Sequence, residues 1–372
     1  MKEGFDLKGI DDPKLLEIVS KAFRVESADT DSATLFVKPR FSDETSFNIV
    51  LDELTKIGLY PLYREENGRL TLRITGKKGN RRELNPVLHL VLLLATIFTV
   101  TVAGYIWWAG GDFEKSVYFT IGLMGILGSH ELGHALVARR NKVDATLPFF
   151  LPVPPFFAFG TLGAVIFMNS PIPDRKSLFD IGIAGPLTGF VLSLPVLILG
   201  IARSTYIPFN PTVEASPFLL GTPLLFNAIS RMILGPELPG QILQTHPIAI
   251  AGWAGLFVTS LNLLPMGQLD GGHVIRSVFP KNFKKIYRIV FKVLFTMGAA
   301  GILAQVYSLK WLIKITWPGW IFWAILVYFM TKLDHPGPLN DVTPLDPTRK
   351  AIAVLILIVF LISFTPVPIM SL

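Results

Sequence analysis

Hydrophobic and polar positions follow one pattern up to about residue 84 and another pattern after it. The first part is polar and carries short apolar repeats with the period of strands or of one helix. These repeats predict a strand at 33–38, a helix at 42–57, and a hairpin formed by 60–64 and 70–74 around a turn at 66–68. Residues 1–84 are therefore predicted to form a small soluble α+β domain.

The second part, residues 85–372, contains recurring apolar stretches of about 20 residues, the length of a bilayer-spanning helix. The predicted spans are 87–109, 117–139, 178–201, 247–266, 287–307, 312–331 and 351–370. Residues 147–168 are apolar but broken by prolines and glycines, which predicts a re-entrant loop or hairpin. An amphipathic helix on the membrane surface is expected around 223–233.

The predicted fold class is an all-α polytopic membrane protein with six to seven transmembrane helices, a re-entrant hairpin and the small N-terminal α+β domain. Composition agrees, since 51% of the residues are hydrophobic and 16% are charged, against about a quarter charged in soluble domains. The net charge of +7 is spread over loops, which argues against a nucleic-acid partner. The chain has no cysteine, so a metal must be bound by nitrogen and oxygen ligands.

Basic residues in the loops predict the orientation of the chain. With seven spans, most basic clusters fall on one side of the membrane, and this side is expected to be the cytoplasm. The N-terminal domain then faces the cytoplasm as well. The clusters on this side are Lys77, Lys78, Arg81, Arg82, Arg139, Arg140, Lys142, Arg175, Lys176, Arg276, Lys281, Lys284, Lys285, Arg288, Arg349 and Lys350.

The second predicted span contains the motif His-Glu-Leu-Gly-His at residues 130–134, inside the otherwise apolar stretch 117–137. On a helix, this spacing places His130 and His134 one turn apart on one face, with Glu131 beside them. Ionisable side chains are costly within a membrane, so they indicate a functional site. The motif therefore predicts a metal site at membrane depth.

Asp270 is the best candidate for a third ligand, because catalytic zinc sites have three protein ligands. It lies at the cytoplasmic end of the fourth predicted span, in the segment Asn262–His273. The predicted topology brings this segment and the histidine pair to the same face of the membrane. In an alternative interpretation, Asp270 caps a helix or binds backbone amides in its glycine-rich turn.

The two motifs, HELGH at 130–134 and NLLPMGQLDGG at 262–272, resemble those of the site-2 protease family of intramembrane metalloproteases. The glycine-rich stretch 159–163 and the Ala-Gly-Pro at 184–186 are also similar to that family. With a soluble N-terminal domain and no PDZ-like insertion, the chain resembles the branch of plastid proteases linked to greening and gravitropism, and their prokaryotic relatives. The resemblance covers roughly residues 117–275, the expected catalytic core.

The resemblance implies a zinc ion held by His130, His134 and Asp270, with Glu131 as the general base. It implies transmembrane proteins in the lipid bilayer as substrates. Asn262 is expected to hydrogen-bond the substrate or the developing oxyanion, or else only to satisfy neighbouring backbone.

Residues 156–168 are expected to form an edge strand that receives an extended substrate by β-augmentation. Gly160 and Gly163 are the substrate-binding candidates in this segment. In an equally weighted alternative, the two glycines are simple turn residues, and only their backbone conformation requires glycine.

The sequence therefore predicts an intramembrane zinc endopeptidase of the site-2 type, in a multi-pass protein of a prokaryotic cell membrane. A metal transporter is an alternative, although the related halves typical of transporters are not found. A non-catalytic scaffold that binds membrane helices is another alternative. A prenyl-processing zinc protease is a near alternative, but its third ligand would be a glutamate on a later span, and the sequence has none there. Whether the chain forms a homo-oligomer stays open.

Overall fold

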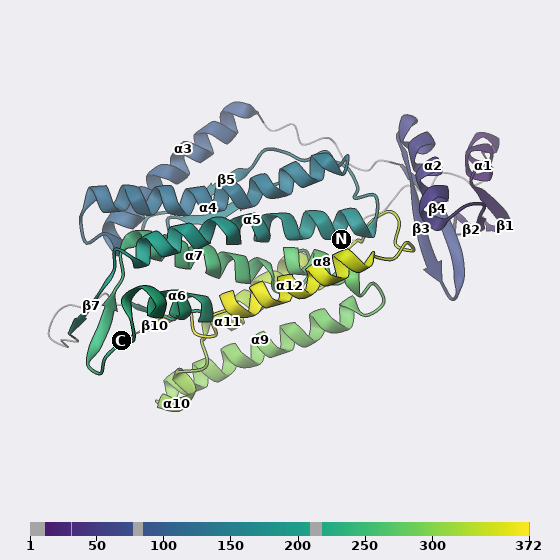
Figure 1. Cartoon of the computed structure of the whole chain (residues 1–372). Helices are drawn as coiled ribbons and strands as arrows, with labels where there is room; N and C mark the ends of the chain where they lie inside the picture. Colours follow the sequence, from purple (N-terminus) through teal and green to yellow (C-terminus); the bar gives the residue numbers. More distant parts are fainter. Residues whose placement is uncertain (1–11, 31, 77–84, 209–217, 372) are drawn as a thin grey trace.

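A computed structural model describes residues 12–30, 32–76, 85–208 and 218–371. A small sheet with two helices forms the N-terminal part, and a bundle of helices follows it (Figure 1). Residues 77–84 lie outside the described residues. The basic segment 77–82 falls within this stretch, and the predicted boundary between residues 84 and 85 falls at its end.

The N-terminal part is a four-stranded antiparallel sheet in the order β1-β2-β4-β3. Its elements are α1 (Pro13–Ser20), β1 (Phe23–Asp29), β2 (Thr34–Pro39), α2 (Asp43–Lys56), β3 (Leu59–Glu66) and β4 (Arg69–Gly76). The turn between β3 and β4 has positive φ at Asn67 and Gly68, as tight hairpins require. Phe23, Phe47 and Leu72 are fully buried in its core. The strand, helix and hairpin expected from the periodicity are thus present.

The rest of the chain is mainly helical. The helices are α3 (Pro86–Ala103) with its π-helical extension η1 (Gly104–Trp108), α4 (Phe113–Arg140), α5 (Arg175–Ile201), α6 (Leu224–Leu234), α7 (Pro247–Asn262), α8 (Asp270–Val278), α9 (Phe283–Val306), α10 (Lys310–Ile313), α11 (Gly319–Thr331) and α12 (Pro347–Ser363). Three two-stranded sheets pair β5 (Phe149–Pro152) with β6 (Thr161–Val165), β7 (Thr205–Pro208) with β9 (Gln241–Gln244), and β8 (Phe218–Leu220) with β10 (Ile369–Ser371).

Four helices of the described chain are long and apolar enough to cross a membrane: Pro86–Trp108, Phe113–Arg140, Arg175–Ile201 and Phe283–Val306. The other three predicted spans contain the shorter helices α7, α11 and α12, with 16, 13 and 17 residues. A straight crossing needs about 20 residues. The structure therefore describes a mostly helical membrane protein, and the count of six to seven spans stays a prediction.

The structure corrects the predicted boundaries of these three spans, and each helix starts or ends close to a proline. The predicted span 312–331 is not one helix, because the chain breaks before Pro318 and α11 starts at Gly319. The span predicted at 247–266 ends at Asn262, ahead of Pro265. The last span ends at Ser363 instead of residue 370, ahead of Pro366, and the chain then enters β10. Proline lacks an amide donor and disfavours helical backbone in the residue before it.

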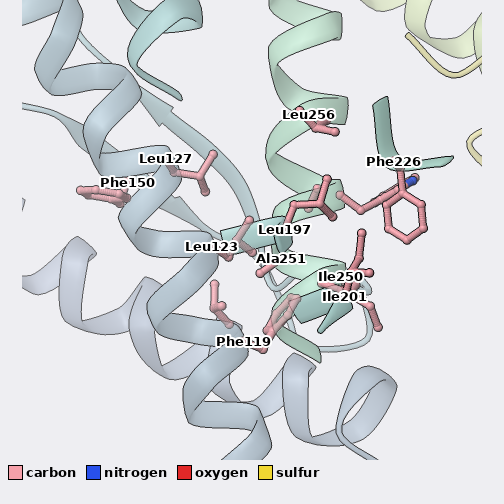
Figure 2. Close-up of a cluster of buried hydrophobic side chains, with 14 residues drawn as sticks. Phe119, Leu123, Leu127, Phe150, Leu197, Ile201, Phe226, Ile250, Ala251 and Leu256 are labelled. Atoms are coloured by element: carbon pink, nitrogen blue, oxygen red, sulfur yellow. The ribbon is translucent and has the colours of Figure 1, made fainter. Parts of the chain in front are cut away.

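The centre of the bundle is formed by α4, α5 and α7, which pack against one another. Figure 2 shows their buried side chains together with Phe150 from β5 and Phe226 from α6. Glycine allows the helices to approach closely: a Cβ atom added at Gly252 of α7 would lie 2.7 Å from the Leu197 Cα of α5. The HELGH motif and the Ala-Gly-Pro segment lie on two of these three helices.

The hairpin expected at 147–168 is present, but its second strand covers only Thr161–Val165 of the predicted 156–168. The hairpin follows α3 along its length through contacts of α3 and η1 side chains with hairpin carbonyl oxygens. These are His89 Nδ1 with Pro148 at 3.0 Å, Thr99 Oγ1 with Gly160 at 2.7 Å, Trp107 Nε1 with Pro155 at 3.0 Å and Trp108 Nε1 with Ala158 at 2.6 Å.

Candidate metal centre

His130 and His134 lie one turn apart on α4, and both are buried. Their Nε2 atoms face each other at 3.2 Å. His134 is six residues ahead of Arg140, the end of α4, which is roughly 9 Å along the helix axis at 1.5 Å per residue. The pair therefore lies within the length of a membrane-spanning helix, near its basic end.

Asp270 meets this pair from the start of α8. Its Oδ2 atom lies 3.2 Å from His130 Nε2, and its Oδ1 atom lies 3.3 Å from His134 Nε2. Ligands at zinc–nitrogen and zinc–oxygen distances in a tetrahedron are roughly 3.3 Å apart, from the usual bond lengths. The donor set of two imidazoles and a carboxylate, with this spacing, can hold a metal ion.

The alternative in which Asp270 caps a helix does not describe this structure. The N-cap residue of α8 is Leu269, and the helix has no side-chain cap. The turn ahead of α8 is tight: a Cβ atom at Gly271 would collide with the Leu263 carbonyl oxygen, and one at Gly272 would collide with that of Gly267. Both glycines are needed for the backbone path that delivers Asp270 to the histidines.

A backbone carbonyl orients one of the histidines. His134 Nδ1 lies 2.7 Å from the carbonyl oxygen of Ile181 on α5. Since a carbonyl oxygen can only accept, Nδ1 donates, and the lone pair of Nε2 is left facing the cluster. Such a partner fixes the ring and its tautomer in metal sites.

Two glycines allow α4 and α5 to approach closely at the cluster. A Cβ atom at Gly185 of α5 would overlap Nε2 of His134 and lie 2.7 Å from Nε2 of His130. A Cβ atom at Gly133 of α4 would lie 2.7 Å from the Ala184 carbonyl oxygen and overlap Thr188. The space beside the imidazoles therefore exists only because these positions lack side chains.

Glu131 follows the first histidine and is 7% exposed. Within the part of the chain that the structure describes, its carboxyl group has no hydrogen bond or ion pair. The side-chain amide of Asn262, at the end of α7, lies 3.2 Å from His130 Nε2. The structure thus brings five of the predicted site residues to one place: His130, Glu131, His134, Asn262 and Asp270.

The two glycines proposed for substrate binding lie in the β5–β6 hairpin and have different surroundings. Gly160 has a φ of 67° and packs on α3, where a Cβ atom would collide with the Thr99 carbonyl oxygen. Gly163 has a φ of 96° and open space around it. Both require glycine for their backbone conformation, and only Gly163 leaves room for a ligand.

Sequence reasoning missed Gly133, Gly185 and the carbonyl of Ile181 as parts of the site. Gly133 lies within the HELGH motif and Gly185 within the Ala-Gly-Pro segment at 184–186, and both motifs resembled the family without any role attached to these glycines. No pattern in the sequence pointed to Ile181. Their roles depend on how closely α5 approaches α4. The residue pattern of a single helix does not predict the distance between two helices.

The buried two-histidine, one-aspartate cluster, on a helix long enough to cross a membrane, agrees with the family that the chain matches. Residues 118–305 match Peptidase family M50. The chain belongs to this family. The resemblance to the site-2 proteases is thereby confirmed. The match covers most of α4, the helices α5, α6, α7 and α8, and nearly all of α9.

Similar proteins come from plant chloroplasts. The chain is 34% identical to the probable zinc metalloprotease EGY1 of Arabidopsis thaliana over 256 residues. The aligned region covers 68% of this chain and 43% of that protein. The chain is 34% identical over 261 residues to rice EGY1, covering 68% and 41%, and 27% identical over 244 residues to Arabidopsis EGY2, covering 65% and 40%. The chain thus spans less than half the length of these curated relatives.

The family and the apolar helices indicate an integral membrane protein. The relatives are named as chloroplast proteins, so they give no support to the predicted prokaryotic cell membrane. The multi-pass topology stays a prediction.

Proposed function

We propose that this protein is an intramembrane zinc endopeptidase that hydrolyses peptide bonds of transmembrane proteins. The observation that carries the proposal is the convergence of His130 Nε2, His134 Nε2 and the Asp270 carboxylate within one buried cluster. The relatives are named probable zinc metalloproteases, and two imidazoles with one carboxylate form a donor set typical of catalytic zinc.

Bound zinc would polarise the scissile carbonyl and make a water molecule acidic enough to lose a proton near neutral pH. His130, His134 and Asp270 would hold the ion. Glu131 accepts the proton of the attacking water and delivers it to the leaving amide nitrogen. Asn262 donates from its amide to the substrate carbonyl region. The unpaired carboxyl group of Glu131 supports its role, since no neighbour competes for its lone pairs.

A substrate helix must be unwound before cleavage, because its own hydrogen bonds protect its backbone. In the described residues, β6 pairs with β5 alone, so its other edge can accept an extended peptide. Leu162 on β6 is 73% exposed, and Gly163 leaves the backbone open. We assign β6 as the strand that receives the substrate.

The proposed topology has seven spans, in which the short helices α7, α11 and α12 complete the four long ones. Both ligand-bearing segments then face the side that carries the N-terminal sheet, and the loop charges assign this side to the cytoplasm or its equivalent. Cleavage near this face releases a fragment on the same side.

The direct test uses purified protein in proteoliposomes with a reporter peptide that carries one apolar span between a fluorophore and a quencher. Glu131→Gln is expected to reduce cleavage by at least about 100-fold, while bound zinc stays at the wild-type level. The matched control is Glu114→Gln on the same helix, where Glu114 accepts a hydrogen bond from Tyr118 Oη at 2.5 Å. Equal cleavage by Glu131→Gln and wild type would contradict the proposal. Reporter binding by wild type without any cleavage would favour the scaffold interpretation.

A further inference from the structure

The segment His335–Val342, here called the junction segment, connects α11 to α12 and contacts both parts of the molecule. Leu339 is 4% exposed and belongs to the hydrophobic core of the N-terminal sheet. The backbone of Tyr63 on β3 donates to the Leu339 carbonyl oxygen at 2.9 Å and accepts from the Asp341 amide at 3.1 Å. The loop ahead of α12 accordingly extends from the helices toward β3 (Figure 1).

The opposite edge of the junction segment is bonded to the helical part. The amides of Leu339 and Asn340 donate to the carbonyl oxygens of Ile172 and Pro173, each at 2.8 Å. These two residues lie directly ahead of α5. The junction segment is therefore a shared strand, with the N-terminal sheet on one edge and the start of α5 on the other.

Two arginines hold this segment from opposite sides. Arg64 of β3 donates to the carbonyl oxygens of Pro338 and Leu339, both at 2.6 Å. Arg276 of α8 is 5% exposed and binds both carboxylate oxygens of Asp341, at 2.8 and 2.5 Å. Bidentate arginine pairs of this kind are directional and strong.

The helix that carries Arg276 also carries the third ligand. Asp270 opens α8, and Arg276 follows six residues later, roughly 9 Å along the axis. With nine residues and no side-chain cap, α8 is too short to be stable without tertiary contacts. Its contacts include the Asp341 pair, the Arg175 bond to the Ser277 carbonyl oxygen at 2.8 Å, and the His273 ring 4.8 Å from His335.

We propose that Arg64 and Arg276 are positioning residues, which make the placement of Asp270 against His130 and His134 depend on docking of the N-terminal sheet. The inference rests on the proposed function, since it concerns the same metal site. Docking of the N-terminal sheet fixes the position of the junction segment. The segment binds Arg276 through Asp341, and this ion pair fixes the position of α8, which carries Asp270. The N-terminal domain thus acts on the zinc site without touching it.

The test is the zinc affinity of the full-length chain in detergent, measured by competition with a chromophoric chelator. Arg64→Ala and Arg276→Ala are expected to weaken zinc binding by about 10-fold, at the lower end of losses seen for residues that support metal ligands. The double variant is expected to be no weaker than Arg276→Ala, because both residues act through one segment.

The matched control is Arg73→Ala, an arginine of the same sheet that bonds Glu66 at 2.9 Å and Thr34 Oγ1 at 2.8 Å. Its zinc affinity is expected to stay within about twofold of wild type, by the usual independence of remote sites. Hydrogen exchange of the Asp341 amide reports docking separately. Faster exchange of the Asp341 amide in Arg64→Ala, with unchanged zinc affinity, would overturn the inference. Should Arg276→Ala fail to fold, Arg64→Ala alone provides the test.

An Asp270→Ala variant separates this inference from the proposed function. If zinc binding depends on Asp270 and is indifferent to Arg64 and Arg276, only the positioning role is wrong. If zinc binding is indifferent to Asp270 as well, the proposed metal site is wrong and the positioning role is overturned with it.

Discussion

The metal site formed by His130, His134 and Asp270 depends on a residue that provides no ligand atom. Gly185 occupies the position on α5 where any side chain would overlap Nε2 of His134. Gly185→Ala is therefore expected to displace the imidazole and weaken zinc binding by at least about 10-fold, the scale found when support of a ligand is lost. Chelator competition on the purified variant measures this loss.

Gly125→Ala provides the control for that substitution. Gly125 lies on α4, and a Cβ atom there would make only an ordinary contact, at 3.9 Å from Leu192 Cδ2. Its zinc affinity is expected to equal that of wild type. Equal zinc affinity of Gly185→Ala and Gly125→Ala would show that the close contact between α5 and the imidazoles is not needed for zinc binding.

At this scale the sequence predicted the donors and missed what surrounds them. His130 and His134 share a helix face by periodicity alone, and Asp270 could be added because span counting brought it to the same face. The positions of Gly185 and the Ile181 carbonyl come from the packing of α5 on α4. That packing depends on side chains along both helices, so no local motif contains it.

Among the elements, the β5–β6 hairpin is the one whose contacts make the sharpest prediction. Gly160→Ala places a Cβ atom against the Thr99 carbonyl oxygen and 2.8 Å from Val100 Cα, at a φ of 67°. Gly163→Ala has a left-handed backbone too, without any overlap. Left-handed backbone costs about 1–2 kcal/mol in both variants, and overpacking adds about 1–3 kcal/mol only in Gly160→Ala.

The thermal unfolding midpoint in detergent is therefore expected to be lower for Gly160→Ala than for Gly163→Ala. Zinc content is expected to stay at the wild-type level in both. Equal midpoints for the two variants would show that the hairpin is not held against α3 at Gly160.

Element boundaries show where apolar windows fail. The first three spans were predicted within a few residues, because α3, α4 and α5 are long and continuously apolar. The span at 312–331 was wrong because average hydropathy does not register Pro318, which separates α10 from α11. In the N-terminal part, β2, α2 and the β3–β4 hairpin were predicted, since local periodicity and the turn at Asn67–Gly68 determine them. The first helix and strand, α1 and β1, were not predicted.

For the whole molecule, the orientation that we propose from the loop charges can be tested with single introduced cysteines, because the chain has none. Lys281 is exposed and pairs with Glu65 of the N-terminal sheet at 3.1 Å, whereas Lys115 precedes the motif on α4. Lys21 follows α1 in the N-terminal part. In sealed vesicles, an impermeant maleimide is expected to label Lys281→Cys and Lys21→Cys from one side and Lys115→Cys from the other. Labelling of all three from one side would contradict the seven-span topology.

The docking of the N-terminal sheet was not predictable from the sequence. Residues 335–342 follow a helix and precede another, and nothing in their order indicates a strand shared with β3. The contact exists because Leu339 completes the core of a small domain, and because the carbonyl oxygens of the segment match the guanidinium of Arg64. Both reasons lie in tertiary structure.

The most direct measurement of the central claim is elemental analysis of detergent-purified wild type beside Asp270→Ala and His134→Ala. The account predicts about one zinc per wild-type chain, and loss of zinc in both variants, because three protein ligands define the site. Wild type without zinc, or zinc retained by Asp270→Ala at the wild-type level, would contradict it.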